Sequence, residues 1–226
     1  MSTHQVITKN YPENLTGGIM ICGINFGYSA EDEALENAGI TTEPEPHSFF
    51  SDKAVNNHGR FRNRVLNWLS SWGFLFVTTA GAESAFERSF FQSNWLDTQT
   101  RSVSSDEVIN EETLVCESDS FLTLVQARKP TVIIFVGAKL IEAFNDIRIR
   151  ERVVSILGSR SGNAEIYQAD LPGYKGTKFK LLAQRFGETQ IIGLPHPQSH
   201  GLTDEYMAGL KPPTHVIQGL AEKYVR

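Results

Sequence analysis

Cysteine and long apolar runs are both scarce in this 226-residue sequence, which holds only two cysteines, Cys22 and Cys116. Two thiolates cannot supply the four ligands of an iron–sulfur cluster or of an all-cysteine zinc site, so both are excluded. No apolar stretch reaches the roughly 20 residues that a membrane helix needs, and the polar first ten residues lack an apolar signal segment. We therefore expect a soluble cytoplasmic protein with reduced cysteines, no cofactor and no membrane partner.

Basic residues are also fewer than acidic residues. The chain has 21 lysines and arginines against 26 acidic residues, a formal net charge of −5. An acidic chain does not coat nucleic acid through bulk charge, although the composition still allows a local basic patch. The densest basic cluster is Arg60, Arg62 and Arg64 around Phe61, and its alternative meaning is a solvated helix face. The length favours a single domain over residues 1–226, which we expect to be monomeric.

Predicted strands alternate with predicted helices along the chain. An apolar run ending at Gly23 is the first predicted strand, Gly187 joins the last two strands in a turn, and residues 98–118 form a polar surface excursion. The other predicted strands cover residues 74–79, 90–95, 131–136, 179–184 and 190–194, and the predicted helices cover 63–72, 138–144 and 213–225. This alternation predicts the α/β class, as a three-layer α/β/α sandwich with a mostly parallel central sheet.

The first motif is Gly-x-Asn-x-Gly, formed by Gly23, Asn25 and Gly27 at the end of the first apolar run. It predicts a buried strand that ends in a sharp turn, which is where open α/β sheets bind their ligands. The glycines let the backbone turn and come close to a ligand, and the Asn25 amide offers donors and an acceptor. Taken alone, the pattern is more typical of a tight turn without chemistry.

The second motif follows the predicted strand at 190–194, where His196 stands between Pro195 and Pro197. Proline fixes its own φ and biases the preceding residue away from helix, so the two prolines give His196 an extended, stiff presentation. The alternative role for His196 is a turn histidine that caps a carbonyl. A metal site on His196 and His200 is not expected, because Pro197 prevents the helical i,i+4 geometry.

Together these turns resemble those of the uracil-DNA glycosylase superfamily, in particular its mismatch-specific and single-strand-selective branches. The family's Gly-x-Asn-Pro-Gly motif is similar to residues 23–27, and its His-Pro-Ser or Asn-Pro-Ser motif to residues 196–198. The end of segment 90–95 resembles the family's uracil-reading asparagine, and 131–144 the strand and helix between the motifs. The resemblance implies a DNA glycosylase that flips uracil, or a related damaged or mismatched base, and hydrolyses its N-glycosidic bond.

The resemblance also implies roles for the two motif residues. Breaking a base–sugar bond builds oxocarbenium character on the sugar and negative charge on the departing base. His196 would donate a hydrogen bond to the anion developing at uracil O2, and Asn25 would hold the attacking water. Because an asparagine amide cannot take a proton from that water, we expect a modest rate. The partner would be DNA containing uracil or a mismatched base, and no cofactor would be needed.

Base binding would involve Asn94, whose amide matches the donor at N3 and the acceptor at O4 of uracil. Gly23 and Gly27 would allow the backbone to approach the flipped base. Phe50, or less preferably Phe49, would supply the aromatic floor on which the base stacks. The alternatives are that Asn94 caps the turn that follows it and that both phenylalanines lie in the core.

DNA contacts would come from two further segments. The loop of His200, Gly201 and Leu202 resembles the family's wedge, with Leu202 filling the space left by the extruded base. Arg60 and Arg64 would contact phosphates. The alternative for Leu202 is that it packs at the start of the helix that follows it.

Two other functions compete with the glycosylase. Phe26 stands where the family has Pro and Gln198 where it often has Ser, and these differences, with the acidic balance, favour a member that holds a nucleobase or nucleic acid without cleaving it. A dinucleotide-binding α/β enzyme ranks last, because residues 23–27 lack the spacing of Gly-x-Gly-x-x-Gly.

Overall fold

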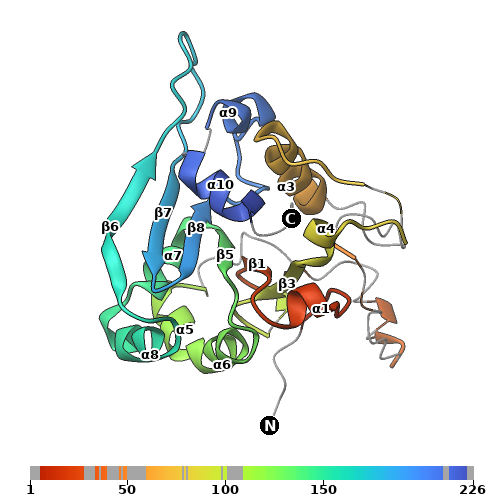
Figure 1. The fold of residues 1–226 in the computed structure, drawn as a ribbon, viewed down its shortest axis with the longest axis vertical. Coiled ribbons are helices and arrows are strands. Elements are labelled where there is room, and N and C mark those ends of the chain that lie inside the picture. The colour runs from red at the N-terminus through yellow and green to blue at the C-terminus, as the bar shows by residue number, and fades with distance from the viewer. Residues whose placement is uncertain are drawn as a thin grey trace.

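The computed structural model describes most of the chain from residue 6 to residue 222 (Figure 1). The described residues are 6–27, 34–35, 37–39, 46, 48–49, 60–77, 79, 81–97, 99–100, 109–210 and 214–222. Among them, no helix is both long enough and apolar enough to cross a membrane.

A six-stranded sheet forms the centre of the fold, in the order β3-β1-β5-β8-β7-β6. The strands are β1 (Ile19–Gly23), β3 (Phe90–Asn94), β5 (Val132–Val136), β6 (Arg160–Tyr167), β7 (Leu181–Phe186) and β8 (Thr189–Leu194). The first four in spatial order run parallel, whereas β7 is antiparallel to both β8 and β6. A separate parallel pair joins β2 (Phe26–Gly27) to β4 (Gln99–Thr100). The α/β fold predicted from the sequence is confirmed.

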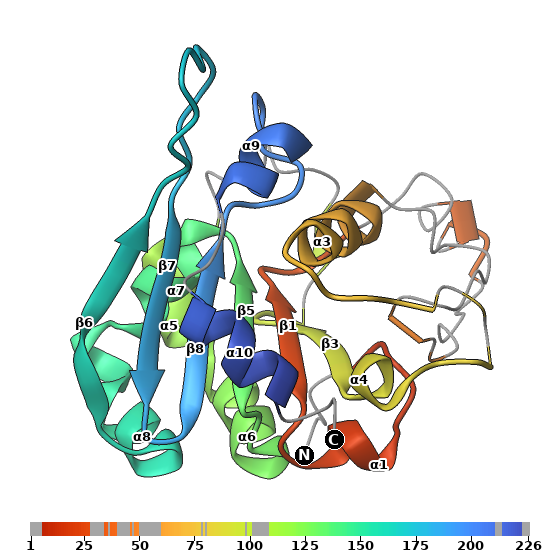
Figure 2. The same ribbon diagram turned by 45° about the horizontal axis from the view of Figure 1, so that its top comes forward.

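Helices cover both faces of this sheet (Figure 2). One face carries α3 (Arg60–Ser71), α4 (Ala85–Arg88), α9 (Asp204–Gly209) and α10 (Thr214–Glu222), and the other carries α5 (Glu111–Cys116), α6 (Ser118–Arg128), α7 (Ala138–Phe144) and α8 (Ile147–Leu157). The short helix α1 (Pro12–Leu15) precedes β1. The layers are those of an α/β/α sandwich.

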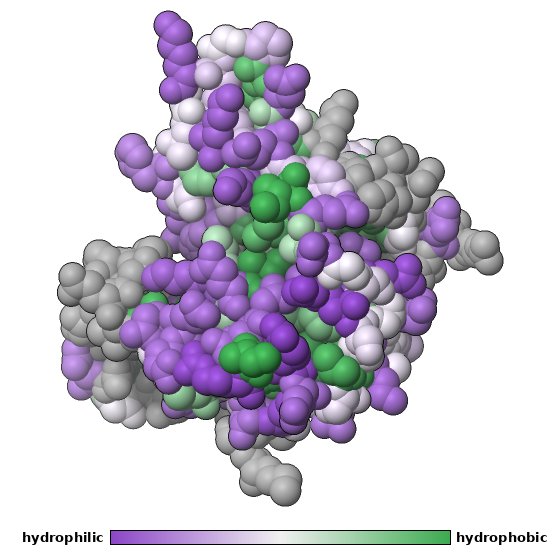
Figure 3. Space-filling model, turned by 90° about the vertical axis from the view of Figure 1, so that its left-hand side faces the viewer, coloured by the Kyte–Doolittle hydropathy of each residue, from purple (hydrophilic) through white to green (hydrophobic). Residues whose placement is uncertain are grey.

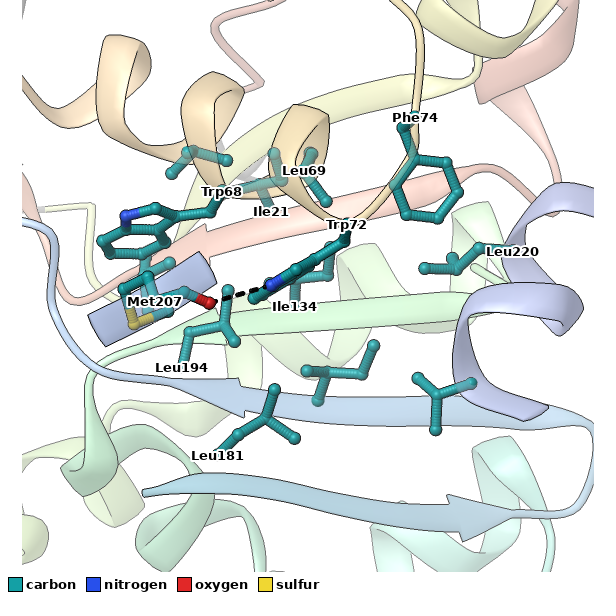
Figure 4. Packing of buried hydrophobic residues seen from close by; sticks show 14 of the residues in the cluster. Ile21, Trp68, Leu69, Trp72, Phe74, Ile134, Leu181, Leu194, Met207 and Leu220 are labelled. Carbon is teal, nitrogen blue, oxygen red and sulfur yellow. Dashed lines mark hydrogen bonds between the residues drawn. The ribbon is translucent and has the colours of Figure 1, made fainter. Parts of the chain in front are cut away.

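The central strands are buried on both sides, which explains their continuous apolar sequences. Alternate residues point to opposite faces, so Ile21 packs with the α3 side of the core and Cys22 with the α6 side. On the α3 side, the indole of Trp72 donates a hydrogen bond to the Met207 carbonyl at 3.0 Å, which ties the end of α3 to α9 (Figure 4).

The strand predicted at 74–79 is wrong. Residues 74–77 are not in a strand, because β3 occupies the place beside β1 and these residues pack on α4 instead. The rings of Phe74 and Phe86 stack with centroids 5.3 Å apart, the Val77 amide donates to Glu87, and Leu75 is 90% exposed.

Two further differences lie on the α6 side and at the far edge of the sheet. The segment 98–118, expected to be irregular, contains α5, whose Leu114 is buried together with Ile109. The edge strand β6 was not predicted, because most of its residues are polar and exposed and therefore show no apolar alternation.

Candidate functional site

The carboxyl ends of the four parallel strands bring the two motifs to one edge of the sheet. Gly23 pairs in register with Asn94, and Val136 pairs with Leu194. Asn25 follows β1 by two residues and His196 follows β8 by two residues. Neighbouring strands lie about 4.8 Å apart, and β8 is two strands from β1. The segment that carries Asn25 and the segment that carries His196 therefore begin roughly 10 Å apart.

The order of the strands places a topological switch point at this edge. The chain leaves β1 to form β3 on one side, and leaves β5 to form β8 on the other. In open α/β sheets the crevice between two such diverging connections is the usual ligand site. Gly137 follows β5 there with φ +132°, and its amide donates to the Leu194 carbonyl at 2.8 Å.

Gly23 allows the side chain of Asn94 to lie against the end of β1. A Cβ atom added at Gly23 would lie 2.4 Å from Asn94 Oδ1, which is far too close for any real contact. Asn94 is 4% exposed, so this amide is held inside the edge of the sheet. We expected the space beside Gly23 to be open to a ligand. In the structure the Asn94 side chain fills that space, and Asn94 is the residue that we predicted would recognise the base.

Backbone hydrogen bonds continue this pairing beyond both strands. The Trp95 amide donates to the Gly23 carbonyl at 2.8 Å, and the Leu96 amide donates to the Ile24 carbonyl at 2.9 Å. The pairing of β2 with β4 then joins Phe26 and Gly27 to the same downstream segment. The turn that carries the half-buried Asn25 is therefore fixed at both ends against the chain that follows Asn94.

Two consecutive turns shape the loop that follows β8. The Ser199 amide donates to the His196 carbonyl at 2.9 Å, and the Leu202 amide donates to the Ser199 carbonyl at 3.3 Å. Pro197 suits the second position of the first turn, because that position requires a φ of about −60° and the proline ring holds φ near this value. Gly201 has φ +77°, a conformation that few residues other than glycine adopt readily. We call residues 195–202 the histidine loop.

A backbone contact sets the tautomer of His196. The Gln198 amide donates to His196 Nδ1 at 3.2 Å, so this nitrogen is the acceptor of the neutral ring and Nε2 carries the proton. The ring is half-buried, with its centroid 6.1 Å from that of Phe61 on α3. The imidazole can therefore act as a neutral hydrogen-bond donor through Nε2.

Arg64 holds the histidine loop from α3. Its guanidinium donates to the Pro197 carbonyl through Nη1 and to the Leu202 carbonyl through Nη2, the latter at 2.6 Å. Nε lies 3.7 Å from a carboxylate oxygen of Asp204, and the Arg64 side chain is 13% exposed. We predicted a phosphate contact for Arg64, but its donors are directed at the protein backbone. The sequence holds no signal that distinguishes these two uses of an arginine.

Leu202 and Phe49, the two large apolar residues of the predicted site that the structure describes, lie in the core. Leu202 is 3% exposed and packs with the α3 side of the core, so it does not project as a wedge; packing at the start of α9 is the alternative that the structure favours. Phe49 is 2% exposed and stacks on Phe90 with centroids 6.4 Å apart, so its ring is not available as a floor for a base. Both corrections reflect the value of burying large apolar side chains.

The remaining predicted residues divide into two groups. His200 and Gly201 are exposed at the turn of the histidine loop, as a DNA contact would require. Phe50 lies outside the described residues. Arg60 is the first residue of α3, and its side chain is not among those described.

The thiols and metal ligands offer no further chemistry in the described part of the chain. Burial raises the pKa of the Cys22 thiol, and a hydrogen bond to the Glu112 carboxylate raises the pKa of Cys116. Both sulfurs are therefore protonated, weak nucleophiles at neutral pH. Within residues that the structure describes, no three His, Cys, Asp or Glu side chains gather as metal ligands.

The site thus combines two amides and one neutral imidazole donor at the switch point of a parallel sheet. Amides recognise the polar edge of a heterocycle, and an imidazole N–H stabilises negative charge that develops on it. Searches of protein-family models and of curated proteins found no match to this chain.

Proposed function

We propose that this protein is a DNA glycosylase of the uracil-DNA glycosylase superfamily, acting on uracil or a related damaged or mismatched base. The single observation that carries the proposal is the placement of Asn25, Asn94 and His196 at the carboxyl ends of parallel strands on one edge of the sheet. The hydrogen bond that His196 Nδ1 accepts from the Gln198 amide favours the tautomer with its proton on Nε2. The cytoplasmic location expected from the sequence belongs to the same proposal.

In the proposed reaction, the C1′–N1 bond breaks and its electron pair leaves with the base. His196 Nε2–H donates a hydrogen bond to uracil O2 as the negative charge develops there. Because the ring is neutral, it stabilises this charge through the hydrogen bond and keeps its proton. Asn25 orients the water that adds to C1′, and the proton of that water passes to solvent or to the departing base. An amide has no basicity, so acceleration relies on leaving-group stabilisation.

Selection of the base would fall to Asn94. Its NH₂ group donates to uracil O4 and its carbonyl accepts from N3–H, whereas cytosine presents the opposite pattern at both positions. The close approach to Gly23 supports this role, because a reader must hold one orientation to discriminate between the two patterns.

The proposal is tested on oligonucleotides that carry one uracil opposite guanine, one opposite adenine, or one in a single strand. Purified protein is incubated with each, and alkali then cleaves the strand wherever the base has been removed. Cleavage at the uracil position supports the glycosylase. Tight binding of the same oligonucleotides without cleavage would instead support the non-catalytic nucleobase-binding member of the fold.

A further inference from the structure

The connection between β6 and β7 stands at the same edge as the candidate site. Because β7 runs antiparallel to β8 and β6 antiparallel to β7, residues 168–180 leave the sheet at the carboxyl end of β8. Figures 1 and 2 show this connection extending past the end of the sheet, on the side where α9 lies. We call residues 168–180 the lysine loop.

Aromatic packing holds the lysine loop against α9. The rings of Tyr174 and Tyr206 have centroids 5.0 Å apart, and the Tyr206 hydroxyl donates to the Phe179 carbonyl at 2.6 Å. Thr177 approaches the histidine loop, because a Cβ atom added at Gly201 would lie 3.2 Å from Thr177 Oγ1. The lysine loop and the histidine loop are therefore direct neighbours.

Three lysines of this loop are exposed. Lys178 and Lys180 flank Phe179, whose ring packs on Tyr206, and both lysines are exposed whereas Phe179 is half-buried. Lys175 is exposed at the tip. In Figure 3 this upper projection is mixed in hydropathy, with hydrophilic residues beside weakly hydrophilic and hydrophobic ones.

The acidic residues of the lysine loop and of α9 are Asp170, Asp204 and Glu205. Asp170 is the one acidic residue of the lysine loop, and Asp204 on α9 accepts hydrogen bonds from Asn67 and Trp68 and pairs with Arg64. None of the three lysines forms an ion pair with another described residue. A chain with a net charge of −5 thus presents three exposed lysines on the loop beside its histidine loop.

We propose that the lysine loop binds the sugar–phosphate backbone of the nucleic acid strand whose base enters the site. This inference rests on the proposed function for its choice of partner. Amines on flexible stems suit phosphates as point charges without reading sequence. Aromatic packing on α9 holds the lysine loop beside the histidine loop. The three lysines would therefore supply the phosphate contacts that we had expected from Arg64, whose donors bind backbone carbonyls.

The test uses a fluorescein-labelled 20-nucleotide single strand of thymines, which contains no uracil. Its binding is measured by fluorescence anisotropy between 50 and 200 mM salt, for the whole protein and for the variant Lys175→Gln/Lys178→Gln/Lys180→Gln. We expect the slope of log K against log salt to fall in magnitude by about 2, since each phosphate contact to a single strand contributes about 0.7. Binding at 50 mM salt should weaken about tenfold or more.

Matched variants separate local contacts from net charge. Lys178→Gln should weaken binding, whereas Arg150→Gln, an equal charge change at an exposed position on α8, should not. Replacing all three lysines by arginine should preserve the slope. Unchanged thermal midpoints show that the loop remains folded.

Each outcome decides one of the two proposals. If the triple variant binds like the whole protein, with the same salt slope, the lysine loop inference is overturned, whether or not uracil is excised. If binding falls as expected but no uracil is released, the inference stands and the proposed function fails. Lysine-dependent binding to vesicles containing phosphatidylserine, without binding to the oligonucleotide, would also overturn it.

Discussion

At the scale of single residues, Gly23 and Asn94 form a pair in which the absence of one side chain sets the position of the other. The Asn94 amide occupies the space that any side chain at position 23 would need. The two residues are also in register on adjacent strands, so neither can move along its strand to relieve a clash. Selection of a base by Asn94 would therefore depend on Gly23, although Gly23 has no side chain that could contact the base.

We expect Gly23→Ala to displace the Asn94 amide and so to lower both stability and uracil release. Overpacking of a tight site costs about 1–3 kcal/mol. In the double variant Gly23→Ala/Asn94→Ala the clash is gone, so its loss of unfolding free energy should be smaller than the sum of the two single losses. Chemical denaturation of the four proteins measures this coupling, and strictly additive losses would show that the two residues do not interact.

Gln184 on β7 is a second residue whose environment makes a prediction. Both polar atoms of its side-chain amide are buried and have no hydrogen-bond partner within the described structure. An unsatisfied buried amide costs free energy that an apolar side chain of similar length would not. We expect Gln184→Met to raise stability by about 1–2 kcal/mol and the thermal midpoint by roughly 2–8 °C. A lower midpoint would mean that this amide is satisfied by water.

At the scale of elements, the histidine loop depends on α3. Arg64 supplies two hydrogen bonds to loop carbonyls, and Asp204 at the start of α9 receives donors from the same helix. The loop carries His196, so the orientation of the imidazole is set by a helix that precedes it by more than 120 residues. Arg64 is thus a positioning residue for His196.

We expect Arg64→Met to leave the Pro197 and Leu202 carbonyls without their donor and to loosen the histidine loop. The cost is about 1–3 kcal/mol. Hydrogen exchange of the Ser199 and Leu202 amides, which close the two turns of the loop, should accelerate while the β1 and β5 amides are unaffected. The matched variant Arg62→Met removes a donor to Phe49 from the same helix and should not change those two amides. Equal protection in both variants would contradict the positioning role.

The start of α8 makes a prediction about pH. Asp146 caps this helix by accepting from the Arg148 amide, and hydrogen bonds from Arg148 lower the pKa of its carboxyl from 3.8 to about 2. Because the folded-state pKa is below the unfolded one, the stabilisation is complete above about pH 4 and is lost as the pH falls towards 2.

Asp146→Asn keeps a good capping side chain but does not titrate. Its thermal midpoint should therefore decline less steeply than that of the parent protein between pH 4 and pH 2, most clearly at low salt because the Arg148 side chain is exposed. Parallel declines would show that Asp146 does not contribute to acid unfolding.

At the scale of the whole molecule, the sequence predicted the parts of the fold that are buried on two sides. The runs at β1 and β5 are apolar throughout because helices cover both of their faces. Some elements with one-sided or partial burial escaped prediction, such as α5 in a polar segment and β6 at an exposed edge.

The same limit applies to the candidate site. Glycine, asparagine and proline at strand ends indicated where the turns lie, because these residues have distinctive backbone preferences. The use of Arg64 and the burial of Leu202 depend on α3 packing against the histidine loop, a contact between segments distant in sequence. Local patterns carry no information about such contacts.

The measurement that tests the central claim most directly is the release of free uracil from DNA under single-turnover conditions. We expect the protein to release one uracil per abasic site formed, and Asn25→Ala and His196→Ala each to slow this step by about 10²–10³-fold, corresponding to about 3–4 kcal/mol, without lowering the thermal midpoint. Absence of uracil release by the parent protein, or undiminished release by both variants, would contradict the assignment of this edge of the sheet as a glycosylase site.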